Sequence, residues 1–222
     1  WLKLYGFRDF KVKVGTDATA DAENAAFVVS RLKRRLARRK ASLRVDANAA
    51  YAGAEQASEA LEPLVRLGVE CVEQPMAPEN DADVANLARR LGVPILLDES
   101  VRTVAEARER LNAGAWVGLN IRLSKNGGFF DSLRLAVLCR ERQAPFQLGC
   151  HVGETGLLAA AQVHVASLLP DARYLEGAFG THLLEQDIVI GAVRFGFRGR
   201  PPRLGRVGLG VEVDENVLRK FL

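Results

Sequence analysis

The chain is poor in the features of secreted and membrane proteins. Its cysteines are odd in number and scattered (Cys71, Cys139, Cys150), which argues against a disulfide framework and for a reducing compartment. We find no signal peptide and no apolar run of membrane length. We therefore expect a cytoplasmic protein that has no membrane partner.

Aromatic residues are also scarce, at 7% of the chain. The net charge of +4 comes largely from two basic runs, Arg31–Lys40 and Arg194–Arg206. No aromatic residue interleaves the charges of the first run, so we interpret it as the solvated face of a helix. We expect no nucleic-acid partner.

What the chain has is ordinary for an enzyme domain. The 48% apolar content and 26% charged content suit a packed core inside a solvated ring of helices. A length of 222 residues allows one large core or two small domains.

Acidic residues recur at the ends of apolar runs. Asp46 ends LRVD, Glu73 lies in VECVEQP and Asp98 ends PILLD, at intervals of about 25 residues. One strand, one helix and two short loops occupy about that length in a β/α barrel. Parallel strands end at one mouth of such a barrel, so the three carboxylates would face a common point. A divalent cation would stabilise them there.

The same period continues in both directions along the chain. The predicted strands start near Phe10, Leu43, Cys71, Pro94, Val117, Phe146 and Tyr174. Helical patterns lie between them, with apolar residues three and four positions apart, as in Val28, Leu32 and Leu36. Strands that alternate with helices predict a parallel sheet, and the fold class is α/β of the TIM type.

Helix boundaries are marked at several places. Thr103 and Glu106 form a T-x-x-E capping box, and Gly68, Gly92 and Gly114 lie where helices should end. Pro63 lies inside a helical pattern, so that helix is expected to begin late or to kink.

The strand count is one short of the eight that such a barrel needs. The opening WLKLYG cannot be the missing strand, because a parallel neighbour needs a crossover of about a dozen residues before Phe10. The chain also has no initiator Met. We therefore expect a fragment, a (β/α)7β barrel that lacks its first strand.

Two lysines stand beside the predicted metal site. Lys11 and Lys13 are two residues apart on a strand, so their side chains point the same way. If they point inward, each other's charge and a nearby divalent cation would lower the pKa of one lysine toward neutrality. A general base needs such a pKa. The alternative is a solvated strand face.

These residues carry a family resemblance. The ordered motifs are K-V-K (11–13), D-A-N (46–48), E-Q-P (73–75), D-E-S (98–100) and S-K-N-G-G (124–128). Together they resemble the enolase superfamily, in particular its muconate-lactonizing and mandelate-racemase branches. That superfamily uses a Lys or His base with one or two Mg²⁺ ions.

The resemblance implies roles for residues of the first four motifs. Asp46, Glu73 and Asp98 would bind Mg²⁺ (Mn²⁺ is an alternative), which in turn would hold a substrate carboxylate. Lys13 would abstract the proton α to that carboxylate, and Lys11 would tune Lys13 and touch the carboxylate. Asn48 would support the metal or bind the substrate. Glu99 is the alternative to Asp98 as the third ligand.

The chain departs from the pattern at Arg122. Many members of the lactonizing branch have a lysine there, as a base on the opposite face of the substrate. Arginine stays protonated and is a poor base, but it binds carboxylates and oxyanions well. A two-lysine racemase is therefore disfavoured. Lys125 is an alternative replacement, although it lies past the strand end.

His151 ends the seventh strand of the full barrel, where the mandelate-racemase branch keeps a histidine that works as acid or base. No orienting partner for it is visible in the sequence, and a structural role is the alternative. Glu154 and Glu176 are candidates for hydrogen bonding to the substrate; helix caps or ion pairs would explain them equally well.

The resemblance also predicts the organisation of the chain. Residues 1–186 would form the barrel, strands two to eight, and residues 187–222 a tail that packs against an N-terminal α+β capping domain outside this chain. The predicted partners are a small-molecule carboxylate and further copies of the chain.

The expected function is Mg²⁺-dependent α-proton abstraction from a carboxylate. A hydroxy-acid or acid-sugar dehydratase ranks first, a cycloisomerase second and a racemase or epimerase third. A catalytically silent barrel with an assembly role is the alternative from another class. A phosphate-binding barrel would leave the three carboxylates unexplained.

Overall fold

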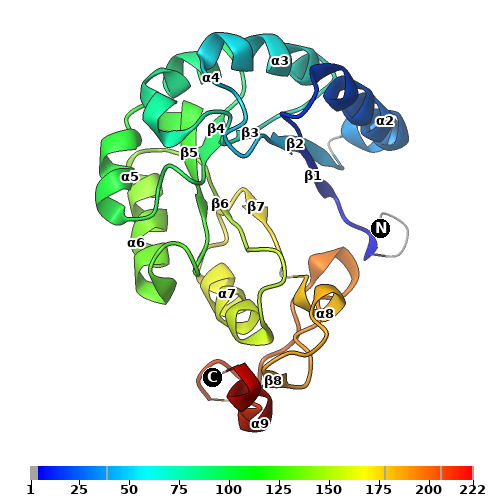
Figure 1. Cartoon of the computed structure of the whole chain (residues 1–222), viewed down its shortest axis with the longest axis vertical. Helices are drawn as coiled ribbons and strands as arrows, with labels where there is room; N and C mark the ends of the chain where they lie inside the picture. Colours follow the sequence, from blue (N-terminus) through cyan, green and yellow to red (C-terminus); the bar gives the residue numbers. More distant parts are fainter. Residues whose placement is uncertain (1–4, 39, 178, 206, 222) are drawn as a thin grey trace. The chain divides into compact units, whose positions relative to one another are not determined.

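The computed structural model describes residues 5–38, 40–177, 179–205 and 207–221. The first four residues of the opening WLKLYG and one arginine of each basic run lie outside the described residues. Seven strands pair in chain order in one parallel sheet, as predicted (Figure 1). The strands are β1 (Asp9–Lys13), β2 (Ser42–Asp46), β3 (Val72–Glu73), β4 (Ile95–Leu97), β5 (Val117–Ile121), β6 (Phe146–Leu148) and β7 (Tyr174–Leu175).

Each strand starts within one residue of its predicted position. Helices fill the intervals between the strands, and a two-stranded antiparallel sheet follows in the tail. The α-helices are α2 (Ala18–Leu36), α3 (Ala54–Arg66), α4 (Val84–Leu91), α5 (Val104–Arg110), α6 (Gly128–Glu141), α7 (Gly156–Leu168), α8 (Gly180–Leu183) and α9 (Glu215–Leu218). The tail strands are β8 (Val189–Ile190) and β9 (Glu212–Val213), and the 3₁₀ helices are η1 (Pro78–Asp83), η2 (Gly114–Trp116), η3 (Phe197–Gly199) and η4 (Arg219–Phe221).

The chain divides into two compact units. The β1–β5 unit comprises Phe7–Asn120 and Val137–Phe146, and the β6–β7 unit comprises Trp1–Gly6, Ile121–Ala136 and Gln147–Leu222. None of the described helices combines the length and the apolarity that a membrane crossing needs.

In the β1–β5 unit, helices α2 to α5 lie outside the strands (Figure 1). Every residue of β2 and of β5 is buried, as is typical of parallel strands covered on both faces. The Gly118 position in β5 has no room for a side chain, because a Cβ would lie 1.8 Å from the carbonyl oxygen of Pro145. The buried strands therefore form part of the core, and the candidate site residues lie at or near the ends of the strands.

The helix boundaries follow local chemistry. Asp17 caps α2 by accepting a hydrogen bond from the Ala20 amide. The predicted capping box of Thr103 and Glu106 is present at the start of α5. Gly92 ends α4 in the left-handed conformation, with φ of 70°. Helix α3, which contains Pro63, begins at Ala54 and continues past the proline to Arg66.

Gly114 differs from its prediction. It begins η2 rather than ending α5, which stops four residues earlier at Arg110. Its φ of 57° explains why glycine occupies the position, since other residues rarely adopt that conformation.

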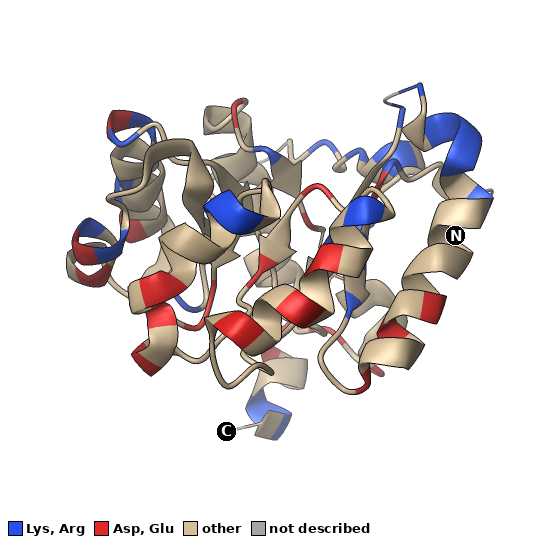
Figure 2. Cartoon of the chain, turned by 90° about the horizontal axis from the view of Figure 1, so that it is seen from above, with Lys and Arg blue, Asp and Glu red and all other residues tan. Residues whose placement is uncertain are grey.

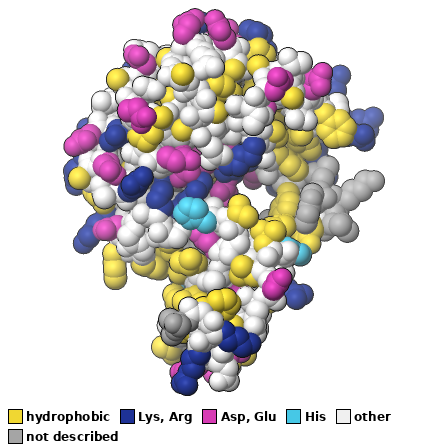
Figure 3. All heavy atoms as spheres, in the orientation of Figure 1, with side chains coloured by type: hydrophobic (Ala, Val, Ile, Leu, Met, Phe, Trp, Pro, Cys, Tyr) yellow, Lys and Arg dark blue, Asp and Glu magenta, His cyan; other side chains and the backbone are white. Residues whose placement is uncertain are grey.

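The predicted solvated helix face is present in α2. Basic residues occupy its last turn, which Figure 2 shows as a basic stretch at one end of the helix, and Leu32 is buried. Charged side chains of both signs are scattered along the outer edge of the β1–β5 unit (Figure 3).

In the β6–β7 unit the tail packs on helix α7. Ala159 and Ala160 of α7 form a core cluster with Val193, against which Phe195 and Leu204 of the tail pack. The carboxylate of Asp187 accepts hydrogen bonds from the Gly156 amide, so the tail also caps the first turn of α7. The tail contains the strands β8 and β9 and the short helix α9. The domain boundary at residue 186 stays a prediction.

Candidate active site

The ends of strands β1 to β3 bring lysines and carboxylates into contact. Lys13 pairs with Asp46 in the sheet register, and Asp46 pairs with Glu73. Lys13 Nζ lies 2.7 Å from Asp46 Oδ2, and Lys11 Nζ lies 3.4 Å from the same oxygen. Lys11 Nζ also lies 3.1 Å from Glu73 Oε2. Both lysines therefore point toward the carboxylates, and they share one face of the strand, as their spacing predicted.

The two lysines differ in their access to solvent. The side chain of Lys11 is 19% exposed, whereas that of Lys13 is 63% exposed. Asp46 and Glu73 are fully buried. A substrate that approaches from solvent can reach Lys13, while Lys11 remains between the two carboxylates.

The electrostatics of Asp46 reflect this setting. Burial acts to raise the pKa of Asp46, but the hydrogen bond from Lys13 and the charges of Lys11 and Lys13 outweigh it. The pKa of Asp46 therefore lies below its ordinary value, and the carboxylate is ionised at neutral pH.

Asn48 and Asn120 extend this cluster. The Asn48 side chain accepts a hydrogen bond from Lys13 Nζ and donates one to Glu99 Oε1 at 3.1 Å. Asn120 Nδ2 donates to Glu73 Oε1 at 2.8 Å. Sequence reasoning missed Asn120. Its position two residues before Arg122, on a strand with every residue buried, was the available signal.

The backbone just beyond the strand ends adopts unusual conformations. The φ angles are 44° at Asn48, 62° at Ala49 and 33° at Gln74, in a region that residues other than glycine rarely adopt. Strain of this kind clusters at functional sites. Here it follows directly after Asp46 and Glu73.

Gln74 anchors the segment that carries Asp98. Gln74 is fully buried, and its Oε1 accepts hydrogen bonds from the amides of Asp98 (2.7 Å) and Ser100 (3.3 Å). Its Nε2 donates to Ser100 Oγ and to the Met76 carbonyl, both at 2.6 Å. The side chain thus fixes the end of β4 beside β3. Sequence reasoning missed this role.

We expect Gln74→Leu to lower the free energy of unfolding by about 2–4 kcal/mol, because it leaves two buried amides without acceptors. Urea unfolding of purified protein measures the change. Gln56→Leu is the matched control, since Gln56 is exposed and accepts one hydrogen bond from the Ala52 amide. Equal losses for the two variants would contradict the anchoring role.

The donor chemistry of the cluster suits a hard cation. Asp46, Glu73 and Asp98 are buried carboxylates, and oxygen donors are what Mg²⁺ prefers. Among the described residues, however, no three His, Cys, Asp or Glu side chains form a cluster able to hold a metal. In this structure Lys11 and Lys13 supply the positive charge beside Asp46.

The remaining predicted residues lie in the β6–β7 unit. The Arg122 amide donates to Asn126 Oδ1 at 2.9 Å, which closes the loop after β5. His151 and Glu154 follow β6, and both contact Ser124. The Glu176 amide donates to the Leu148 carbonyl in the β6–β7 pairing.

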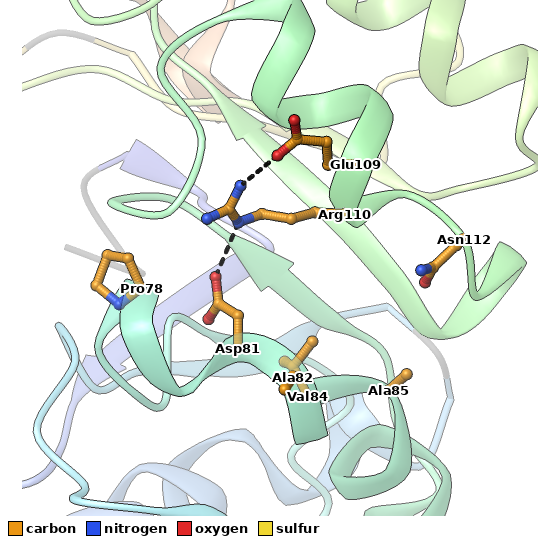
Figure 4. A pocket seen from close by; sticks show the side chains of 8 residues that line it. All are labelled: Pro78, Asp81, Ala82, Val84, Ala85, Glu109, Arg110 and Asn112. Atoms are coloured by element: carbon orange, nitrogen blue, oxygen red, sulfur yellow. Dashed lines mark hydrogen bonds and ion pairs between the residues drawn. The ribbon is translucent and has the colours of Figure 1, made fainter.

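A separate pocket of about 300 Å³ lies beside η1 and α5 (Figure 4). Arg110 Nε lies 3.2 Å from Asp81 Oδ2, and Arg110 Nη1 lies 3.8 Å from Glu109 Oε2. Burial raises the pKa of Asp81 despite opposing hydrogen bonds from Ser100 and Arg110. None of the predicted site residues lines this pocket.

Parallel strands with alternating helices, and acidic side chains at successive strand ends, define a TIM-type β/α domain with an acidic, lysine-flanked site. The chain belongs to the enolase superfamily: residues 1–217 match the family described as Enolase C-terminal domain-like. The predicted family and fold class are thereby confirmed.

Several characterised proteins are similar to the chain. It is 32% identical over 222 residues to muconate cycloisomerase 1 of Pseudomonas putida (99% of this chain, 57% of the relative). It is 30% identical over 217 residues to an o-succinylbenzoate synthase of Geobacillus stearothermophilus (97% and 54%). It is 33% identical over 174 residues to an N-succinylamino acid racemase of Thermus thermophilus (78% and 46%). The chain spans about half the length of these relatives.

Solved structures of similar fold belong to related enzymes. A muconate lactonizing enzyme has a TM-score of 0.85 and 28% identity, over 99% of this chain and 59% of that one. A dipeptide epimerase of Cytophaga hutchinsonii, in complex with Mg and the dipeptide D-Ala-L-Val, has a TM-score of 0.82 and 25% identity (96% and 56%). The relatives include isomerases, and their names cover different reactions.

Proposed function

We propose that this domain performs Mg²⁺-dependent abstraction of the proton α to a substrate carboxylate, with Lys13 as the base. The observation that carries the proposal is the contact of Lys13 Nζ with Asp46 Oδ2 at 2.7 Å, beside buried Glu73. It places an exposed lysine next to candidate metal ligands. The enzymatic character of the relatives, and the Mg bound by the dipeptide epimerase, support it.

Asp46, Glu73 and Asp98 would hold the ion, with Glu99 as the alternative to Asp98. Bound Mg²⁺ would supply the positive charge that stabilises a doubly charged enolate. Asn48 would keep Lys13 in place through their hydrogen bond. Lys11, held between Asp46 and Glu73, would tune the site electrostatically.

The reaction class follows from which groups can take a proton. After losing its ammonium proton, Lys13 would take the α-proton, and the electron pair of the broken C–H bond would move into the carboxylate. Arg122 stays protonated and cannot act as a second base. β-Elimination, as in dehydration of a hydroxy acid, and cycloisomerisation therefore remain ahead of racemisation between two lysines. The cycloisomerase among the relatives supports the second of these.

Racemisation or epimerisation is a second candidate, because His151 lies in the loop after β6 with a carboxylate nearby. His151 Nδ1 lies 3.5 Å from Glu154 Oε1. A histidine can act as a general acid or base toward an enolate. The racemase and the epimerase among the similar proteins favour the same reading.

We also propose that copies of the chain associate with one another.

Solvent exchange tests the proposed function. We expect Mg²⁺-dependent incorporation of deuterium at the α-carbon when the protein is incubated in ²H₂O with N-succinylamino acids, dipeptides and 2-hydroxy acids. Mass spectrometry of the recovered acids measures it, and EDTA should abolish it. Binding of Mg²⁺ without exchange into any of these acids would favour the silent-barrel alternative.

A further inference from the structure

The loops that follow β5 and β6 carry a hydrogen-bonded trio in the β6–β7 unit. Ser124 Oγ lies 2.7 Å from His151 Nδ1 and 2.8 Å from Glu154 Oε1. The same carboxylate oxygen lies 3.5 Å from His151 Nδ1 and accepts the His151 backbone amide at 2.8 Å. The imidazole is thus held on its Nδ1 edge.

The positions of the protons follow from donor counting. An ionised glutamate has no proton to donate, so the Ser124 hydroxyl must give its only proton to Glu154. Ser124 Oγ can then only accept from His151, which requires a proton on Nδ1. In the neutral ring the lone pair is therefore on Nε2.

The two ends of this chain of hydrogen bonds differ in their exposure to solvent. The Glu154 side chain is 8% exposed, whereas that of His151 is 49% exposed. Ser124 is held in a loop that Asn126 closes, because Asn126 Oδ1 accepts the Arg122 amide and the Asn126 amide donates to the Arg122 carbonyl. An anchored carboxylate thus orients a ring that solvent can reach.

We infer that Ser124 and Glu154 are positioning residues that hold His151 as the Nδ1–H tautomer and leave Nε2 as its acid–base atom. The tautomer stands on the geometry alone, and its use in catalysis rests on the proposed function. Nε2 would take an α-proton while the C–H electron pair stays on the substrate as an enolate. The imidazolium, stabilised by Glu154, would return the proton in the reverse step.

Nitrogen-15 NMR of the histidine rings in the full chain tests the inference, with His151→Asn to assign the signals. We expect neutral His151 to show a protonated Nδ1 and an unprotonated Nε2. In Ser124→Ala the ratio of the Nδ1–H to the Nε2–H tautomer should fall by roughly 10-fold, because the acceptor for Nδ1–H is lost. Ser124→Thr should restore it, since threonine keeps the hydroxyl.

Ser30→Ala, which removes an exposed hydroxyl of α2, is the matched control and should leave the ring signals unchanged. An Nε2–H tautomer in the parent protein, or an unchanged ratio in Ser124→Ala, would overturn the inference. The ring signals are read without substrate or Mg²⁺, so failure of the proposed function would not alter them.

Discussion

Lys13→Ala is expected to reduce α-proton exchange by roughly 10²- to 10⁴-fold, the range that a positioned general base contributes. The physical reason is exposure: Lys13 is the more accessible of the two lysines, at 63% against 19% for Lys11. Affinity for Mg²⁺ should stay the same or rise, because an ammonium group that competes for Asp46 is gone. Exchange rates in ²H₂O and calorimetric titration measure the two quantities.

Lys33→Ala is the matched control for Lys13→Ala. Lys33 is an exposed residue in the last turn of α2, so its loss removes the same charge without touching the carboxylates. Exchange by Lys13→Ala at the rate of the parent would show that the base is another group.

Glu73→Gln is expected to weaken Mg²⁺ binding by roughly 100-fold or more, since losing even an outer-shell partner costs 10- to 100-fold. Glutamine keeps the size of the side chain and can still accept the hydrogen bond from Asn120, so the change is mainly one of charge. The substitution also removes one of the two buried carboxylates that pair with Lys11. We expect this loss to lower the free energy of unfolding of the metal-free protein by about 1–3 kcal/mol. Calorimetric titration and urea unfolding measure these effects.

Glu55→Gln controls for the loss of one negative charge. Glu55 lies on α3 with its side chain 74% exposed and pairs with Arg90, outside the site. It should bind Mg²⁺ and unfold like the parent, as surface ion pairs contribute little. Binding of Mg²⁺ by Glu73→Gln with parental affinity would remove Glu73 from the metal site.

Much of the fold could be predicted from the chain because its signals are local. The apolar runs that end at Asp46, Glu73 and Asp98 mark buried parallel strands, and the capping box at Thr103 marks a helix start. Gly114 shows the limit of such local signals. The glycine correctly indicated an unusual backbone conformation, but it did not indicate whether it ends one helix or begins the next.

The candidate site could be predicted only in part. Residues two apart on one strand share a face, so the orientation of Lys11 and Lys13 followed from spacing. The burial of Lys11 between Asp46 and Glu73 did not, because it depends on how the ends of β2 and β3 surround it.

Sequence alone determined the positions of the strands, the start of α5 and the placing of acidic residues at strand ends, because hydrophobic periodicity and capping act within a few residues. Tertiary structure decided which polar side chains meet: Gln74 with the amides of Asp98 and Ser100, and Ser124 with His151 and Glu154. Such contacts join residues 24 to 30 positions apart. Their geometry depends on loop conformation, which no local pattern in the chain encodes.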